Sequence, residues 1–240
     1  PLKNPIFRDD TDLRILEQFT ADQQWDLQPG DMLYLPPHFA HHGVALDACL
    51  TLSVGFRSPS QLQLLEAFTH TLLEQEITEK LYSDADVKVC HSTTEIDSAA
   101  TRRVYQLLLQ GLNDNTELLP LAMGRLLTET KPTLQLLAEA YLTDKPALQE
   151  IETGFHSGST LQRNGYLRFA WHKGISNSYL FVAGEAYLVE REAAEHLAWL
   201  TTAQKITQQD WQRLQAYPEL LNACCELIAE GAWYWEEAQR

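Results

Sequence analysis

Cysteine is scarce in this sequence. The four cysteines stand at positions 49, 90, 224 and 225, and none belongs to a Cys-x-x-Cys pair. This spacing argues against a disulfide framework and against a zinc ribbon, because both need regularly paired cysteines. We expect reduced thiols, and we interpret Cys224 and Cys225, which fall within a leucine-rich helical pattern, as buried.

Long hydrophobic runs are missing as well. No apolar stretch approaches the roughly 18 residues that a membrane span requires, and no signal peptide opens the chain. The sequence begins at Pro1 rather than at a methionine. We therefore expect a soluble cytoplasmic protein, and we interpret the chain as the remainder of a longer one.

Basic residues are few. There are 18 Lys and Arg against 33 Asp and Glu, which gives a net charge of -15. A field of this sign repels phosphate backbones and anionic lipids, so we expect no direct nucleic-acid binding and no membrane binding. A basic protein partner is favoured. Hydrophobic residues still form 45% of the 240 residues, enough for one large domain or two modest ones.

The first part of the chain is predicted to form short strands. Apolar and alternating patterns favour strands at 25–27, 32–35, 44–46 and 49–56, whereas residues 1–24 fit a short helix or an irregular connector. In the strand at 49–56, Thr51 and Ser53 share one face and leucines occupy the other. The small polar face could line a cavity, or the strand could simply be half-exposed.

The rest of the chain is predicted to be helical and then mixed. Three- and four-residue spacing of leucines predicts helices at 61–82, 99–112, 117–128 and 133–142, and residues 144–164 have the composition of a linker. Beyond the linker we predict strands at 166–171, 179–183 and 186–190, followed by helices at 191–200 and 207–231, the second of them interrupted near Pro218. The predicted fold class is therefore α+β.

The most informative motif runs from Pro29 to Gly43. Its three histidines, His38, His41 and His42, follow a strand that ends at two prolines, and neutral imidazole is a common transition-metal ligand. Gly30, Pro36 and His41 fall on the frame of the second motif of cupin barrels. His38 and Ala45 depart from that frame, which has Gly and Asn at those places.

A closer resemblance covers nearly the whole chain. The runs PGDMLYLPPHFAHHGVAL and TLSVGFRSPS resemble the end of the catalytic domain of bacterial ribosomal oxygenases, which are JmjC-type proteins, and residues 82–87 and 231–235 are similar to that family too. The resemblance implies the C-terminal part of a cupin/JmjC double-stranded β-helix at 1–59 and a helical dimerisation region at 60–143. The linker at 144–164 and a winged-helix-like module at 165–240 would follow.

The resemblance also implies a chemistry. Members of the family use iron(II) and 2-oxoglutarate to hydroxylate an arginine of a large-subunit ribosomal protein, and two histidines and one carboxylate hold the metal. The distal histidine of that triad falls on His41, and Thr51 and Ser53 would contact 2-oxoglutarate. The other two ligands come from a His-x-Asp or His-x-Glu pair, which is absent before His41. A jelly-roll barrel needs about eight strands, so we expect this shortened chain to bind iron poorly and to be inactive alone.

Several alternatives remain open. His38 and His42 can be rim residues, or one of them could contact substrate, and Arg57 could pair with a carboxylate or be a surface residue. A zinc site could use His38, His41 and Cys49, or Cys90 with His91, although the ligands are paired on only one side. The aromatic run at 233–235 suits a core or interface anchor. Residues 161–240 hold seven basic and ten acidic residues, which does not favour DNA binding by the last module.

Two other functions compete with the arginine hydroxylase. One is a noncatalytic homodimeric scaffold, in which the leucine faces of the helices pair and the last module holds a protein partner. The other is a histidyl hydroxylase of the same superfamily.

Overall fold

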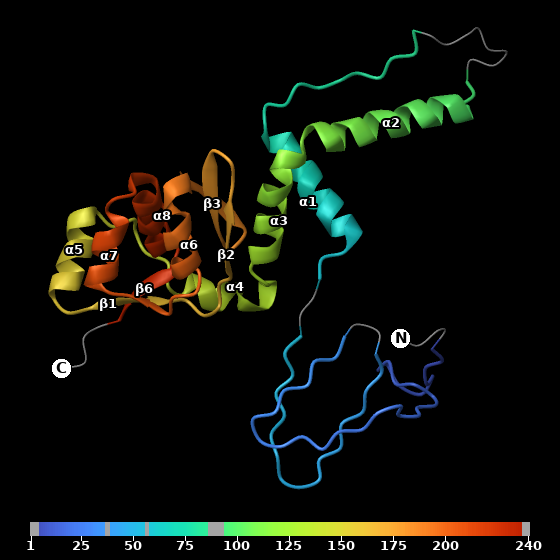
Figure 1. Cartoon of the computed structure of the whole chain (residues 1–240), viewed down its shortest axis with the longest axis horizontal. Helices are drawn as coiled ribbons and strands as arrows, with labels where there is room; N and C mark the ends of the chain where they lie inside the picture. The colour runs from blue at the N-terminus through green and yellow to red at the C-terminus, as the bar shows by residue number, and fades with distance from the viewer. Residues whose placement is uncertain (1–4, 37–38, 56–57, 86–93, 237–240) are drawn as a thin grey trace. The chain divides into compact units, whose positions relative to one another are not determined.

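The computed structural model describes residues 5–36, 39–55, 58–85 and 94–236. The chain divides into two compact units, Pro1–Phe56 and Arg57–Arg240 (Figure 1). Each unit is described by itself.

The first unit has little regular structure in its described part. An isolated antiparallel bridge joins Phe7 to Leu16, and Arg8 N donates to Ile15 O at 2.9 Å. No described residue of this unit is buried. Residues 5–24 form an irregular connector rather than the short helix that the sequence also allowed.

The strands predicted at 25–27, 32–35, 44–46 and 49–55 are not formed in the structure, and this part of the prediction is wrong. Figure 1 draws the region as a blue trace without arrows. A strand needs a partner for its backbone groups and a surface that covers its apolar face. Neither is present among the described residues of this unit, and Leu50, Leu52 and Val54 are 87%, 83% and 74% exposed.

The second unit begins with helices whose starts follow from their caps. Helix α1 spans Gln61–Glu74 and starts at a capping box, in which Ser60 Oγ accepts from Gln63 N and Gln63 Oε1 accepts from Ser60 N. Helix α2 spans Ser98–Asp114 and is capped by Asp97. The prediction for α1 extended to residue 82, but Gln75 is in the extended conformation and ends the helix.

The remaining helices of the helical region connect it to the following sheet. They are the 3-10 helix η1 at Thr116–Leu118, α3 at Leu119–Thr128 and α4 at Pro132–Glu139. Helix α3 packs against α1 and against a three-stranded sheet. Gly124 makes this approach possible, because a Cβ at that position would lie 2.4 Å from the ring of Phe181.

Two three-stranded antiparallel sheets occur among the described residues. One has the order β2-β3-β4 and the other the order β5-β1-β6. The strands are β1 Thr160–Arg163, β2 Phe169–Lys173, β3 Asn177–Val182, β4 Glu185–Glu190, β5 Lys205–Ile206 and β6 Trp233–Glu236. The helices beside them are α5 Leu148–His156, η2 Arg191–Ala193, α6 Ala194–Leu200, α7 Gln208–Leu214 and α8 Pro218–Ala229.

The segment 144–164 is not the linker that its composition predicted. It contains α5 and β1, and β1 is the central strand of its sheet, with Leu161 paired to both Ile206 and Trp235. Ser157, Gly158 and Ser159 form the turn between α5 and β1, whereas Thr153 and Gly154 lie within the helix. Ile151, Phe155 and Leu161 are buried, and their burial in the core outweighs the weak local preference for a loop.

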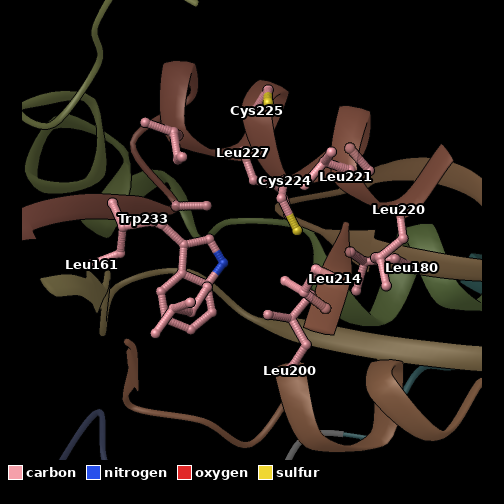
Figure 2. Close-up of a cluster of buried hydrophobic side chains, with 14 of the residues drawn as sticks. Leu161, Leu180, Leu200, Leu214, Leu220, Leu221, Cys224, Cys225, Leu227 and Trp233 are labelled. Carbon is pink, nitrogen blue, oxygen red and sulfur yellow. The ribbon is translucent and has the colours of Figure 1, made fainter. Parts of the chain in front are cut away.

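The core of this unit is assembled around α8 (Figure 2). Leucines from α6, α7 and β3 meet Leu220, Cys224 and Leu227 of α8, and Trp233 of β6 is fully buried beside them. Both cysteines of α8 are buried free thiols, as the sequence predicted. Burial raises the pKa of Cys224 above that of an ordinary thiol.

Candidate functional site

His41 lies in the irregular part of the first unit. It is exposed, and its Nδ1 lies 3.3 Å from the backbone carbonyl oxygen of Phe39. The neighbouring His42 is exposed as well, and its ring approaches that of Phe19 edge-on, with 6.4 Å between the centroids. The two imidazoles therefore have different surroundings, although they are adjacent in the sequence.

Thr51 and Ser53 are also exposed. Neither forms a side-chain hydrogen bond with another described residue. The placement that would bring their hydroxyls beside His41 requires the strand pairing that this unit does not form. Their proposed contact with 2-oxoglutarate therefore remains a prediction.

The described residues do not by themselves fit an iron site. No group of three or more His, Cys, Asp or Glu side chains within that part of the chain converges in a way that could hold a metal ion. A two-His, one-carboxylate site needs three such side chains on one face of the metal. His38, Arg57, Cys90 and His91 lie outside the described residues. The zinc alternative, which relied on His38 or on Cys90 with His91, therefore stays untested.

Several charged side chains of the second unit form contacts with other residues of the same unit. The guanidinium of Arg163 stacks 4.2 Å from the centroid of the Phe169 ring, and Nη1 donates to Thr201 O at 2.7 Å. Burial lowers the pKa of Arg163. Arg168 donates to Leu127 O at 3.3 Å. Both cations therefore support the fold around the two sheets.

Acidic side chains gather on β4 and α8. Glu190 accepts from the backbone amides of Glu219 and Leu220 at 2.7 and 3.1 Å, and it thereby satisfies the N-terminus of α8. Tyr187 donates to Glu230. Burial raises the pKa of Tyr187, and the neighbouring Glu230 reinforces the shift.

The connection between α4 and α5 crosses the end of α8. Thr143 N donates to Ala229 O at 2.9 Å, and Lys145 Nζ donates to Asn222 Oδ1 at 3.0 Å and to Glu226 Oε1 at 2.9 Å. Beside this connection lies a hollow of about 330 Å³. Four of its eight lining residues are aromatic, and Tyr141 and Tyr234 stack there with their centroids 4.3 Å apart.

Comparison with protein families supplies the decisive observation. A family model described as ROXA-like winged helix matches residues 110–234, and a JmjC domain model matches residues 3–64. The first match covers more than half of the chain. The chain belongs to the ROXA-like winged-helix family. The predicted resemblance to ribosomal oxygenases and the predicted fold class are confirmed by these matches.

The family match extends the last module toward the N-terminus. It begins at 110, upstream of the predicted boundary at 165, and it includes α3, α4, α5 and β1. The packing explains this extension, because α3 contacts the β2-β3-β4 sheet and β1 is the central strand of the other sheet. A division at 165 would separate strands that pair with each other.

Two relatives bear the names of a ribosomal protein hydroxylase and a probable ribosomal oxygenase. The chain is 26% identical over 227 residues to the ribosomal protein uL16 3-hydroxylase of Escherichia coli, covering 94% of this chain and 58% of that protein. It is 42% identical over 50 residues to a probable ribosomal oxygenase of Haemophilus influenzae, covering 21% of this chain and 12% of that one. The chain thus spans little more than half of the length of the E. coli relative.

Solved structures share the fold. The E. coli ribosomal oxygenase YcfD matches with a TM-score of 0.60 at 20% identity, over 76% of this chain and 48% of that one. The structure of YcfD with cobalt and 2-oxoglutarate also matches with a TM-score of 0.60, at 21% identity, over the same shares of the two chains. At this level of identity the likeness establishes the fold alone.

Among the described residues, no helix is long and apolar enough to cross a membrane.

Sequence reasoning missed the hollow beside the α4–α5 connection. It interpreted the aromatic run at 233–235 as a core or interface anchor, which holds for the fully buried Trp233. Tyr234 and Trp235 are only partly buried and line the hollow together with Tyr141. The pairing of Tyr141 with Tyr234 joins segments far apart in the chain, and no local pattern signals it.

Proposed function

We propose that this chain is part of an iron(II)- and 2-oxoglutarate-dependent oxygenase that hydroxylates an arginine side chain of a large-subunit ribosomal protein. The observation that supports the proposal most strongly is the similarity to the uL16 3-hydroxylase over 94% of the chain. The JmjC match at 3–64 includes His41, Thr51 and Ser53. A ribosomal protein as substrate would place the protein in the cytoplasm.

In this proposal His41 is the distal histidine ligand, and Thr51 and Ser53 contact 2-oxoglutarate. The sequence contains no His-x-Asp or His-x-Glu pair at any position. The other two ligands would therefore have to come from outside these 240 residues. We infer that the 240-residue chain is inactive alone, because one imidazole does not provide the three ligands of a facial triad.

The substrate side of the proposal rests on charge. The net charge of -15 favours association with a basic protein. Complementary electrostatic fields speed the encounter of two proteins, and repulsion disfavours partners of like charge. A ribosomal protein that must neutralise RNA phosphates is such a partner. Direct binding of nucleic acid by this chain is not part of the proposal.

The test uses a longer form of the protein. It is expressed from the gene together with the in-frame sequence that lies upstream of the codon for Pro1. Incubated with iron(II), 2-oxoglutarate and oxygen, that protein should release succinate and add one oxygen atom to an arginine peptide of uL16. His41→Ala should abolish both, whereas His42→Ala should retain most of the activity. The 240-residue chain should release no succinate.

The outcomes separate the alternatives. Oxygen found on a histidine peptide would replace the arginine assignment with the histidyl one. Absence of both succinate and oxygen transfer, with a folded protein and intact iron binding, would contradict the enzyme proposal. Full activity of His41→Ala would remove this residue from the site.

A second candidate, the homodimeric scaffold, is favoured by α2. None of the 17 residues of this helix is buried, and its exposed apolar residues include Val104, Tyr105 and Leu108. These residues share one face at three- and four-residue spacing, and such a face normally packs against another element. We propose that a second copy of the chain covers it. The dimer is compatible with either function.

A further inference from the structure

The hollow beside the α4–α5 connection is formed by three separate segments. Residues 141–146 form one wall, Ile228 near the end of α8 contributes to the floor, and β6 forms the other wall. Its volume of about 330 Å³ lies at the small end of the range for ligand sites, which is roughly 300–1,000 Å³. A single side chain of a partner therefore suits it better than a large cofactor.

The walls are held in place by interactions that do not involve the hollow itself. The hydrogen bond from Thr143 N to Ala229 O ties the connection to α8, and Lys145 pairs with Glu226 on the same helix. On the opposite side, the ring of Trp235 packs edge-on against Phe155, with 5.0 Å between centroids. Because these supports are already formed, little further ordering is needed for a ligand to bind.

The chemistry of the lining favours a flat cation. Tyr141, Tyr234 and Trp235 present aromatic rings, and the face of an aromatic ring attracts a cation through its quadrupole. Guanidinium groups also stack on such faces, which ammonium groups cannot do. The apolar lining would accommodate the methylene stem of a long side chain.

A negative charge lies beside the rings. Asp144 lines the hollow and is exposed, and its carboxylate forms no ion pair with another residue in the described part of the chain. The adjacent cation, Lys145, is already paired with Glu226. A cation that entered the hollow would therefore meet an available carboxylate, in a protein whose net charge is strongly negative.

We propose that this hollow binds one arginine side chain of a basic polypeptide, with the guanidinium against the aromatic rings and beside Asp144. The site lies in the winged-helix part of the chain and is a docking site, not a catalytic one. If the proposed function holds, the polypeptide is the ribosomal protein substrate; the existence of the binding site does not depend on catalysis.

The experiment uses the 240-residue chain and two capped peptides that differ at one position. One peptide contains a single arginine between glycines, and the other contains citrulline, which has nearly the same shape without the charge. Nuclear magnetic resonance of the indole N–H groups reports binding at Trp235 directly. We expect the arginine peptide to shift that resonance in a saturable manner and the citrulline peptide to bind at least about threefold more weakly.

Two matched variants locate the charge. Asp144→Asn should weaken binding of the arginine peptide by about threefold, in line with an exposed ion pair. Glu195→Gln removes one exposed carboxylate from α6 and should leave the affinity unchanged. Tyr141→Leu should weaken both peptides, provided that its circular dichroism spectrum matches that of the parent chain.

Three results would overturn the inference. They are equal binding of the two peptides, equal effects of Asp144→Asn and Glu195→Gln, and preferential displacement of the Trp235 signal by a short single-stranded RNA. Failure of the hydroxylation assay would leave these binding measurements intact, so the two proposals can fail separately.

Discussion

At the scale of single residues, Gly231 controls how α4 meets β6. Its φ of +68° lies in the left-handed region, where residues with a Cβ are strained. A Cβ at this position would also lie 2.6 Å from the backbone carbon of Tyr141. The buried Asn164 reinforces the junction, because its Nδ2 donates to Gly231 O at 2.9 Å.

We therefore expect Gly231→Ala to destabilise the protein by about 2–4 kcal/mol, as the sum of a left-handed backbone penalty and a steric overlap with backbone. Urea unfolding followed by circular dichroism measures the loss. Gly165→Ala is the matched control, because a Cβ there meets no atom within 4 Å. Equal stability of the two variants would contradict the assigned role of Gly231.

A second prediction at this scale concerns Glu230. Burial raises the pKa of this carboxyl, and repulsion from Glu185 and Glu226 adds to the shift, while the hydrogen bond from Tyr187 opposes it. A raised pKa means that the folded state disfavours the ionised carboxylate. Stability is therefore lost as the pH rises from about 4.3, the ordinary value for Glu, through the folded pKa.

Glu230→Gln should raise stability at pH 7 by less than about 1 kcal/mol, since the residue is partly exposed and solvent screens the repulsion. The gain should vanish below about pH 4, where the parent residue is protonated in both states. Gln keeps an oxygen that can accept from Tyr187. Thermal unfolding at several pH values measures the effect, with Glu195→Gln as the control, and a gain that persists at low pH would refute the electrostatic explanation.

At the scale of secondary-structure elements, α2 is the helix whose packing is least complete. Its described contacts include a hydrogen bond from Arg103 Nε to Tyr82 Oη at 3.0 Å and an ion pair between Lys80 and Asp114 at 2.5 Å. Both involve polar atoms at the surface. The apolar face with Val104, Tyr105 and Leu108 remains exposed, and burying it would gain free energy.

If a second copy covers this face, Leu108→Glu should shift the mass measured by light scattering at micromolar concentration from dimer toward monomer. A charge at the centre of an apolar interface costs several kcal/mol, which weakens association at least about 100-fold. Gln110→Glu adds the same charge on the opposite face and should leave the mass unchanged. A monomeric parent chain would rule out the homodimer.

At the scale of the whole molecule, charge has more influence on association than on folding. The net charge of -15 acts over distances comparable to the Debye length, which is about 10 Å at 0.1 M salt. Close ion pairs such as Lys145 with Glu226 are screened less than this long-range field. Added salt should therefore weaken capture of a basic partner and leave the stability of the fold nearly unchanged.

If the proposed substrate is correct, capture of uL16 by the chain should weaken at least about tenfold between roughly 50 and 200 mM sodium chloride, mainly through slower association. The unfolding midpoint should change little over the same range. Sucrose at matched osmolality is the control for effects unrelated to charge. Capture that does not depend on salt would contradict an electrostatic basis for recognition.

The helices and the family were predictable from local features. Ser60 and Asp97 mark the starts of α1 and α2, and leucine spacing predicted most of the other helices, because capping and periodicity act over a few residues. The motif around His41 indicated the JmjC relationship. The role of His41 itself remains a prediction, since its surroundings depend on strand pairing that the described residues do not form.

Sequence alone thus determined most of the helices, the net charge and the family relationship of this protein. Tertiary structure decided that the Gly- and Ser-rich segment 144–164 contains a helix and a central strand, and that Tyr141 stacks on Tyr234 beside Asp144. The physical reason is distance along the chain. Helix caps and the apolar faces of helices are set by neighbouring residues. A central strand or an aromatic hollow depends on residues from distant segments of the chain. Those segments meet only when the common core around α8 is buried.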